Sequence, residues 1–183
     1  MEIRLSLLLL AVLLMAGVAL SASHPRAVSD PLAADTLALA ELEDAAALAR
    51  GDLEVARKLT TAYLRLGQPG LVIAAVRSAQ PELARDPLLT HRLSQAYEAS
   101  GRVDDALTTA QVAFARCTTP DAGASGCNIA TLTALEVHLS ALAMLQRWGV
   151  QEPRRDTRTA LAYQLAQRTA RIASLGVTTP IGE

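Results

Sequence analysis

The chain has 183 residues, of which 51% are hydrophobic and 3% aromatic, and its formal net charge is −1. This length and composition are enough for one domain with a hydrophobic core. The scarcity of aromatic residues disfavours a β-sandwich, and the near-zero net charge provides no overall field that would draw the chain to nucleic acid.

Residues 1–22 form a separate N-terminal segment. Arg4 is followed by a run over residues 5–20 that is apolar except for Ser6, and then by small residues that suit cleavage by a signal peptidase. The run is intermediate in length between a signal-peptide core and a membrane-spanning helix, and Glu2 offsets the charge of Arg4. Two alternatives remain open, a cleaved signal peptide or a retained single transmembrane anchor within residues 5–22. Both predict an exported chain in a periplasmic or other extracytoplasmic compartment, either soluble or anchored.

The remainder reads as a helical domain. Residues 23–30 are polar and contain a proline, so we expect a short linker there, and residues 177–183 form a C-terminal tail after a domain at 31–176. N-cap residues, helix-starting prolines and turn glycines mark the helix ends. They predict seven helices, near residues 31–50, 52–66, 69–80, 87–100, 103–116, 128–148 and 156–175. No strand or hairpin pattern is present, so the predicted fold class is all-α.

Two of the predicted helix pairs repeat each other at a spacing of about 34 residues. Tyr97 repeats Tyr63, and the turn glycine Gly101 repeats Gly67. The same offset relates Leu93 to Leu59, Ala96 to Ala62 and Ala113 to Ala79. A period of this length with a helix-turn-helix pattern is typical of repeat architectures in which stacked helix pairs share a core.

The segments at 59–79 and 93–115 resemble the tetratricopeptide repeat (TPR). In that family the first helix carries a leucine, a small residue and an aromatic residue before the turn glycine. The matching residues are Leu59, Thr60, Tyr63 and Gly67, and again Leu93, Ser94, Tyr97 and Gly101. Small residues follow where the second helix crosses the first, here Val72, Val76 and Ala79, and Ala106, Ala110 and Ala113. The resemblance implies a right-handed α-solenoid of stacked antiparallel helix pairs.

The resemblance also implies a binding surface. In TPR proteins the first helices of successive repeats line a concave groove that holds an extended or helical segment of another protein. Carried over residue by residue, the partner groove consists of Glu54, Arg57, Thr61, Leu64, Arg65, Leu88, His91, Gln95 and Glu98. The family's clamp for a C-terminal carboxylate needs an asparagine where Thr61 stands, so the type of ligand stays open.

Cys117 and Cys127 flank a turn-rich loop between two predicted helices. An even number of cysteines at short spacing in an exported chain predicts a disulfide, and two unrelated thiols are the alternative. The spacing is unlike that of a redox-active CxxC pair, and two thiols alone are too few for a metal site.

No pattern predicts a catalytic, cofactor-binding or metal-binding residue. His91 and His138 have no histidine, cysteine or carboxylate three or four residues further on that would form a ligand pair on a helix, so we expect both at the surface or in the groove. The glycine-containing loop near Cys127 lacks the lysine of a phosphate-binding loop. We therefore predict no cofactor and no enzyme. A helical enzyme would need a buried polar cluster, most plausibly around His138, Glu136 and Arg147.

Charge is distributed unevenly along the chain. Acidic residues prevail over residues 30–54, and arginines prevail over residues 147–171. Two solvated helix faces explain this pattern. The alternatives are self-association of acidic and basic ends and contact of the basic end with anionic headgroups.

These observations together predict a non-enzymatic protein-interaction scaffold of the cell envelope. Its partner is another protein or peptide and not nucleic acid, and it meets the membrane through the N-terminal segment if that segment is uncleaved. The alternative is a structural subunit of a membrane-associated assembly that supports secretion or protein maturation.

Overall fold

The computed structural model describes residues 31–119 and 127–174. The predicted N-terminal segment (1–22), linker (23–30) and tail (177–183) lie outside the described residues. The chain divides into two units, residues 1–38 and 39–183. In the first unit the described residues, 31–38, are the beginning of a helix that continues into the second unit.

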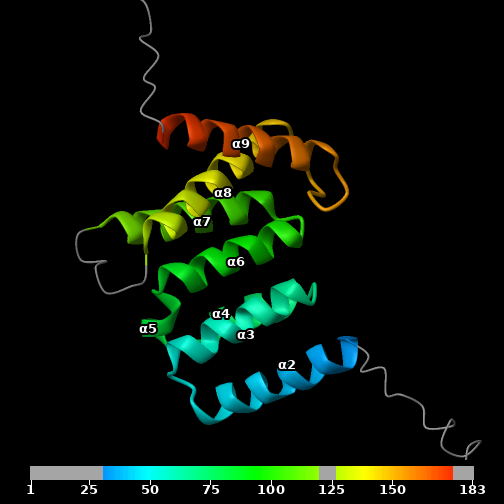
Figure 1. The fold of residues 1–183 in the computed structure, drawn as a ribbon, viewed down its shortest axis with the longest axis vertical. Helices are drawn as coiled ribbons and strands as arrows, with labels where there is room; N and C mark the ends of the chain where they lie inside the picture. The colour runs from blue at the N-terminus through cyan, green and yellow to red at the C-terminus, as the bar shows by residue number, and fades with distance from the viewer. Residues whose placement is uncertain (1–30, 120–126, 175–183) are drawn as a thin grey trace, which may run out of the picture. The chain divides into compact units, whose positions relative to one another are not determined.

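The described residues form eight helices and no strand, which confirms the predicted all-α class for this part of the chain (Figure 1). The helices are α2 (Pro31–Leu48), α3 (Leu53–Arg65), α4 (Pro69–Arg77), α5 (Pro81–Ala84), α6 (Pro87–Ala99), α7 (Val103–Thr118), α8 (Ile129–Arg147) and α9 (Arg158–Ser174). Seven of them correspond to the predicted helices within a few residues at each end. The exception is α5, a single turn begun by Pro81 in a stretch where the sequence predicts no helix.

The helices begin where local chemistry favours a start. Asp52, Asp86 and Asn128 each accept a backbone hydrogen bond from the first turn of α3, α6 and α8, at 2.8–3.0 Å. Such a cap satisfies amide groups that have no partner inside the helix. Proline stands at the first position of α4 and α6, where its missing amide hydrogen costs nothing.

Three helix ends share one turn geometry. Gly67, Gly101 and Gly149 have φ values of 68°, 77° and 64°, a left-handed conformation that favours glycine. After each glycine, the next amide donates to the carbonyl five residues earlier, at 2.9–3.0 Å. This is the Schellman arrangement that ends many helices. The turn after α8 therefore has the same geometry as the turns after α3 and α6, although its sequence matches theirs only in the glycine.

Within residues 39–183, helices that are neighbours in the chain pack on one another. α3 contacts α4 and α6, α4 contacts α6, and the contacts continue from α6 to α7, α7 to α8 and α8 to α9 (Figure 1). On α2, the side chains of Leu39, Leu42 and Ala46 pack against the cluster formed by α3, α4 and α6.

The core consists of two clusters of buried residues. The first is Leu59, Tyr63, Val72, Val76 and Ala96. The second, built by α6 to α9 and the turn before α9, is Tyr97, Val103, Ala106, Ala110, Ala141, Leu142, Leu145, Val150, Ala162 and Ala166. Alanine is frequent where these helices cross, and its short side chain allows them to approach closely.

The two repeated tyrosines have equivalent surroundings. Tyr63 and Tyr97 are both buried, in successive clusters. The Tyr63 hydroxyl donates to Glu43 Oε1 at 2.9 Å, and Arg77 Nε donates to the Tyr97 hydroxyl at 3.2 Å. Glu43 and Arg77 are themselves one repeat period apart in the sequence. The two tyrosines, one repeat period apart, therefore share their residue type and also the position of their hydrogen-bond partner.

Among the described residues, α8 is long and apolar enough to cross a membrane by length and composition alone. Here it packs between α7 and α9, and its residues Leu135, Leu142 and Leu145 are fully buried. Core helices of soluble proteins meet the same criterion, so length and composition alone are weak evidence for a membrane span.

Candidate functional site

The nine residues of the predicted groove lie on α3 and α6, but few of them are available to a partner. Glu54 and Arg65 are exposed, and Leu64 and Leu88 are half-buried. Thr61 donates from Oγ1 to a backbone carbonyl of its own helix at 2.8 Å, and Gln95 accepts from Arg92 at 2.9 Å. The remaining three residues, Arg57, His91 and Glu98, have polar partners on other elements.

Arg57 connects α3 to the start of α6. Its Nε donates to Asp86 Oδ1 at 3.2 Å, and its Nη2 donates to Asp86 Oδ2 at 2.5 Å. The Asp86 side chain is only 3% exposed and also caps α6. The hydrogen bond to Asp86 raises the pKa of the Arg57 guanidinium. A partner in the predicted groove would therefore compete with a buried carboxylate for this arginine.

A chain of four polar side chains runs through α6, α8 and α9, and we call it the polar chain. His91 Nε2 lies 2.9 Å from His138 Nδ1, and His138 Nε2 lies 3.1 Å from Glu98 Oε2. The Tyr163 hydroxyl donates to the same Glu98 oxygen at 2.7 Å. The rings of His138 and Tyr163 are stacked, with centroids 6.2 Å apart. Three helices are thus held together by hydrogen bonds among four side chains.

The polar chain corrects the expectation that both histidines lie at the surface or in the groove. His91 and His138 are 7% and 3% exposed. A ligand pair on one helix has its members three or four residues apart, whereas these partners are 40 and 47 residues apart in the sequence. The cluster suggested around His138 also has different members, because Glu136 and Arg147 are exposed.

Proton positions in the polar chain follow from the donors and acceptors. Burial, and then the neighbouring His138 and Arg92, lower the pKa of His91 to about 3, so His91 is neutral at pH 7. Burial and then Glu98 raise the pKa of the Tyr163 hydroxyl, which stays protonated. A Glu98 carboxylate accepts, so His138 Nε2 carries a proton. His138 Nδ1 can then accept from His91 Nε2, and each bond has one donor and one acceptor.

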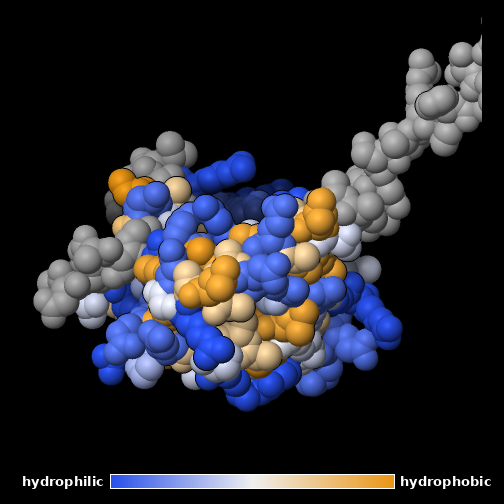
Figure 2. Space-filling model, turned by 90° about the horizontal axis from the view of Figure 1, so that it is seen from below, coloured by the Kyte–Doolittle hydropathy of each residue, from blue (hydrophilic) through white to orange (hydrophobic). Residues whose placement is uncertain are grey.

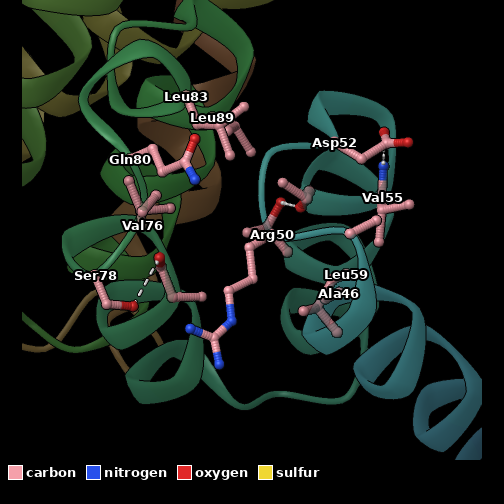
Figure 3. A pocket seen from close by; sticks show the side chains of 15 residues that line it. Ala46, Arg50, Asp52, Val55, Leu59, Val76, Ser78, Gln80, Leu83 and Leu89 are labelled. Atoms are coloured by element: carbon pink, nitrogen blue, oxygen red, sulfur yellow. Dashed lines mark hydrogen bonds between the residues drawn. The ribbon is translucent and has the colours of Figure 1, made fainter.

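A second feature is a cleft of ≈520 Å³ between α2 and α3 on one side and α4, α5 and α6 on the other (Figure 3). We call it the apolar cleft. Its lining includes Ala49, Val55, Ala56 and Leu59 on the first side and Val76, Ala79, Leu83 and Leu89 on the second. The Arg50 side chain extends between the two sides. Ser78, also in the lining, donates to Ala74 O at 2.9 Å, so its hydroxyl has a partner.

Sequence reasoning missed the apolar cleft because it lies on another face of α3 than the predicted groove. Val55, Ala56 and Leu59 line the cleft, whereas Glu54 and Arg57 were assigned to the groove. The short α5, which the sequence did not predict, contributes Leu83 to the opposite wall. One feature of the sequence could have indicated the cleft, namely the small residues that follow one another at the ends of α2 and α4.

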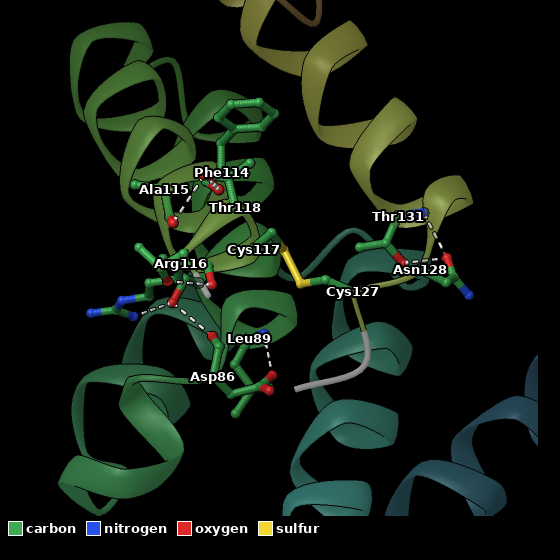
Figure 4. Close-up of a disulfide and its surroundings, with 12 residues drawn as sticks. Asp86, Leu89, Phe114, Ala115, Arg116, Cys117, Thr118, Cys127, Asn128 and Thr131 are labelled. Atoms are coloured by element: carbon green, nitrogen blue, oxygen red, sulfur yellow. Dashed lines mark hydrogen bonds between the residues drawn. A yellow bond between two sulfur atoms is a disulfide. The ribbon is translucent and has the colours of Figure 1, made fainter. Parts of the chain in front are cut away.

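The predicted disulfide joins Cys117 near the end of α7 to Cys127 before α8, with their Cα atoms 5.5 Å apart (Figure 4). A loop of this length contributes about 2–3 kcal/mol when closed by an unstrained bridge. Arg116, beside Cys117, donates to Ala84 O at 2.9 Å and to Thr90 Oγ1 at 2.7 Å. The end of α7 is therefore attached both to the segment before α8 and to the segment around α5 and α6.

Among the described residues, no three or more histidine, cysteine, aspartate or glutamate side chains are grouped so that they could hold a metal ion. No protein-family model, curated protein or solved structure matches the chain.

Proposed function

We propose that the protein is a non-enzymatic interaction scaffold of the cell envelope that binds a segment of another protein in the apolar cleft. Its architecture is a TPR-like right-handed stack of antiparallel helix pairs. The partner is an apolar peptide segment or helix, and no cofactor takes part.

The observation that carries this proposal is the repetition of contacts at the period of the sequence repeat. The Tyr63–Glu43 and Tyr97–Arg77 hydrogen bonds occupy equivalent places, and the turns at Gly67 and Gly101 share their geometry. Stacked helix repeats that contact their neighbours in this way present extended surfaces suited to other polypeptides. This supports a scaffold in preference to a fold built around one catalytic pocket.

The apolar cleft supplies the contact surface for such a partner. Its volume of ≈520 Å³ lies within the range of pockets that enclose small ligands. Its walls are mostly alanine, valine and leucine side chains, which would gain from burial against apolar side chains of a partner. Arg50 is exposed beside these walls and can pair with a carboxylate of the bound segment.

The predicted groove takes a smaller part in this proposal. Glu54 and Arg65 are its two exposed charged residues and can contact a partner that extends beyond the cleft. Arg57 and His91 hold helices together and are assigned structural roles. We assign the polar chain a structural role as well, because its four groups use one another as hydrogen-bond partners.

An envelope location agrees with the disulfide, since such bonds persist in oxidising compartments outside the cytosol. The apolar run of residues 5–20 supplies either the export signal or the anchor. Mass spectrometry of the mature N-terminus would distinguish the two.

The test is site-specific photocrosslinking in cells that produce the full chain. A photoreactive residue replaces Ala49, which is exposed and lines the apolar cleft, or Gln111, an exposed control on α7. We expect one discrete crosslinked protein from position 49 and none from position 111. Adding Ala79→Phe, which fills the cleft without changing charge, should reduce the crosslink several-fold while the circular dichroism and melting temperature stay unchanged.

The outcome also separates the two candidate functions. Equal crosslinking from positions 49 and 111 would favour a structural subunit embedded in a larger assembly. A crosslink from position 49 that Ala79→Phe leaves unchanged would contradict binding in the apolar cleft.

A further inference from the structure

The last helix, α9, carries an apolar stripe on its outer side. Leu161, Leu165 and Ile172 are 48%, 37% and 55% exposed. Their spacing of four and seven residues places them along one line of the helix. The buried residues Ala162 and Ala166 lie on the side that packs against α8. The stripe is therefore separate from the core.

The charges on α9 are all positive. Its sequence contains three arginines and no acidic residue. Arg168 lies three residues after Leu165 and four before Ile172, and it is exposed beside the stripe. Arg158 at the start of the helix is paired with Asp156. The outer side of α9 is thus apolar in the middle and basic at its edge.

The part of α2 at residues 39–48 has the complementary pattern. Alanine and leucine are spread around its whole circumference, although one side is covered by the core through Leu39, Leu42 and Ala46. On the opposite side lie Ala40, Glu41, Asp44, Ala47 and Leu48, all exposed, with Leu48 at 89%. Figure 2, which views the molecule from the α2 end, shows hydrophobic side chains lying between hydrophilic ones. The outer side of this part of α2 is therefore apolar at Ala40, Ala47 and Leu48 and acidic at Glu41 and Asp44.

We propose that the outer side of α9 in one copy binds the outer side of α2 in a second copy, head to tail. The exposed leucines of the two helices would pack on one another. Arg168 of one copy would lie near Glu41 and Asp44 of the next, which gives opposite charges across the contact. The occupant is a second copy because both faces are apolar and their charges are of opposite sign.

Two consequences follow from this arrangement. The contact is heterologous, so a pair of copies keeps one unused α2 face and one unused α9 face, and further copies can add to give a ring or an open chain. Stable interfaces bury at least about 1,200 Å² in total, and a contact between two single helices buries less. The association should therefore be weak and should depend on concentration. Because exposed charges form part of it, salt should weaken it.

The same basic and apolar stripe could instead meet an anionic membrane surface. That occupant would make no use of the carboxylates on α2. Changes at Glu41 and Asp44 therefore distinguish the two occupants, since they affect self-association but leave the α9 stripe unchanged.

The experiment is sedimentation velocity of the full-length chain in a neutral detergent over a wide range of concentration. The α9 variant carries Leu165→Glu and Arg168→Glu, and the α2 variant carries Glu41→Arg and Asp44→Arg. All these positions are exposed, and circular dichroism checks that each variant is folded. The N-terminal segment is the same in every sample, so it cannot account for differences between them.

We expect the wild-type chain to form a concentration-dependent series of oligomers, and each variant alone to sediment as the smallest species. Mixing the two variants should restore association, because one normal α2 face and one normal α9 face remain between them and the two altered faces also carry opposite charges. A wild-type chain that does not self-associate would overturn the proposal. So would oligomers that persist in either variant, or a mixture that forms no complex.

Discussion

The two copies of the helix pair, α3–α4 and α6–α7, share their turns and their tyrosines but differ in how tightly they close. In the second copy Ser94 Oγ donates to Ala106 O at 2.7 Å, a direct bond between the paired helices, and Ala106 is fully buried. In the first copy the equivalent Thr60 donates to carbonyls of its own helix. The first copy borders the apolar cleft, whereas the second is covered by α8 and α9, so we call them the open copy and the closed copy.

One register position shows the difference most clearly. Arg57 and His91 are one repeat period apart in the sequence, and both reach a later segment of the chain. Arg57 pairs with Asp86 at the start of α6, and His91 bonds to His138 in α8. The position therefore connects one copy to the next. The same backbone register supports a partly exposed ion pair in the open copy and a buried hydrogen bond between two histidines in the closed one.

The largest expected effect concerns this connection in the open copy. Arg57→Glu removes the partner of a buried carboxylate and places a second carboxylate beside it. Loss of one member of a buried ion pair is strongly destabilising, and with Arg57 partly exposed we expect about 2–4 kcal/mol. Urea unfolding measures the change. Arg65→Glu is the matched control, because Arg65 is exposed on the same helix and should change stability by less than about 0.5 kcal/mol. An equal loss of unfolding free energy in both variants would mean that the ion pair with Asp86 does not stabilise the fold.

The second prediction compares Ala113 and Ala79, which occupy the same register position in the closed and open copies. Ala113 is fully buried, and Ala79 lines the apolar cleft. Ala113→Leu overpacks the core and should destabilise the protein by about 1–3 kcal/mol. Ala79→Leu extends into open space and should change stability by less than about 0.5 kcal/mol. Thermal and urea unfolding of both variants tests this. Similar losses at both positions would show that the first copy is as closed as the second.

The helices themselves were predictable because their ends depend on local chemistry. Asp52 and Asp86 as caps, and Gly67 and Gly101 as turn residues, act within a few residues of their own position. The repeat period added the equivalence of the two tyrosines, which the hydrogen bonds now extend to Glu43 and Arg77. Local signals and the period thus determined the elements and their repetition.

The site was less predictable because it depends on contacts between distant segments. His91 and His138 are neighbours only through the packing of α6 on the later helices, and no spacing within one helix reveals this. The apolar cleft exists because α5 and the end of α4 stand apart from α3, which is a matter of tertiary packing. The repeat period still gave some indication of these contacts. Arg57 and His91 occupy the same position in the two copies, and each bonds to a later segment of the chain.

The last prediction concerns the buried pair of the closed copy. With its pKa lowered to about 3, His91 stays neutral in the folded chain, whereas an unfolded histidine binds a proton below about pH 6.5. Between these values the unfolded chain binds more protons, so stability falls as pH falls, by about 1.4 kcal/mol per pH unit from this group. His91→Gln keeps a side chain that can donate to His138 but cannot titrate. Its unfolding free energy should therefore decline less steeply than that of the wild type between about pH 6.5 and pH 4, while carboxylates contribute equally to both. Parallel pH profiles would mean that His91 binds a proton over the same pH range in the folded protein as in the unfolded chain, which would contradict a neutral His91 in the closed copy.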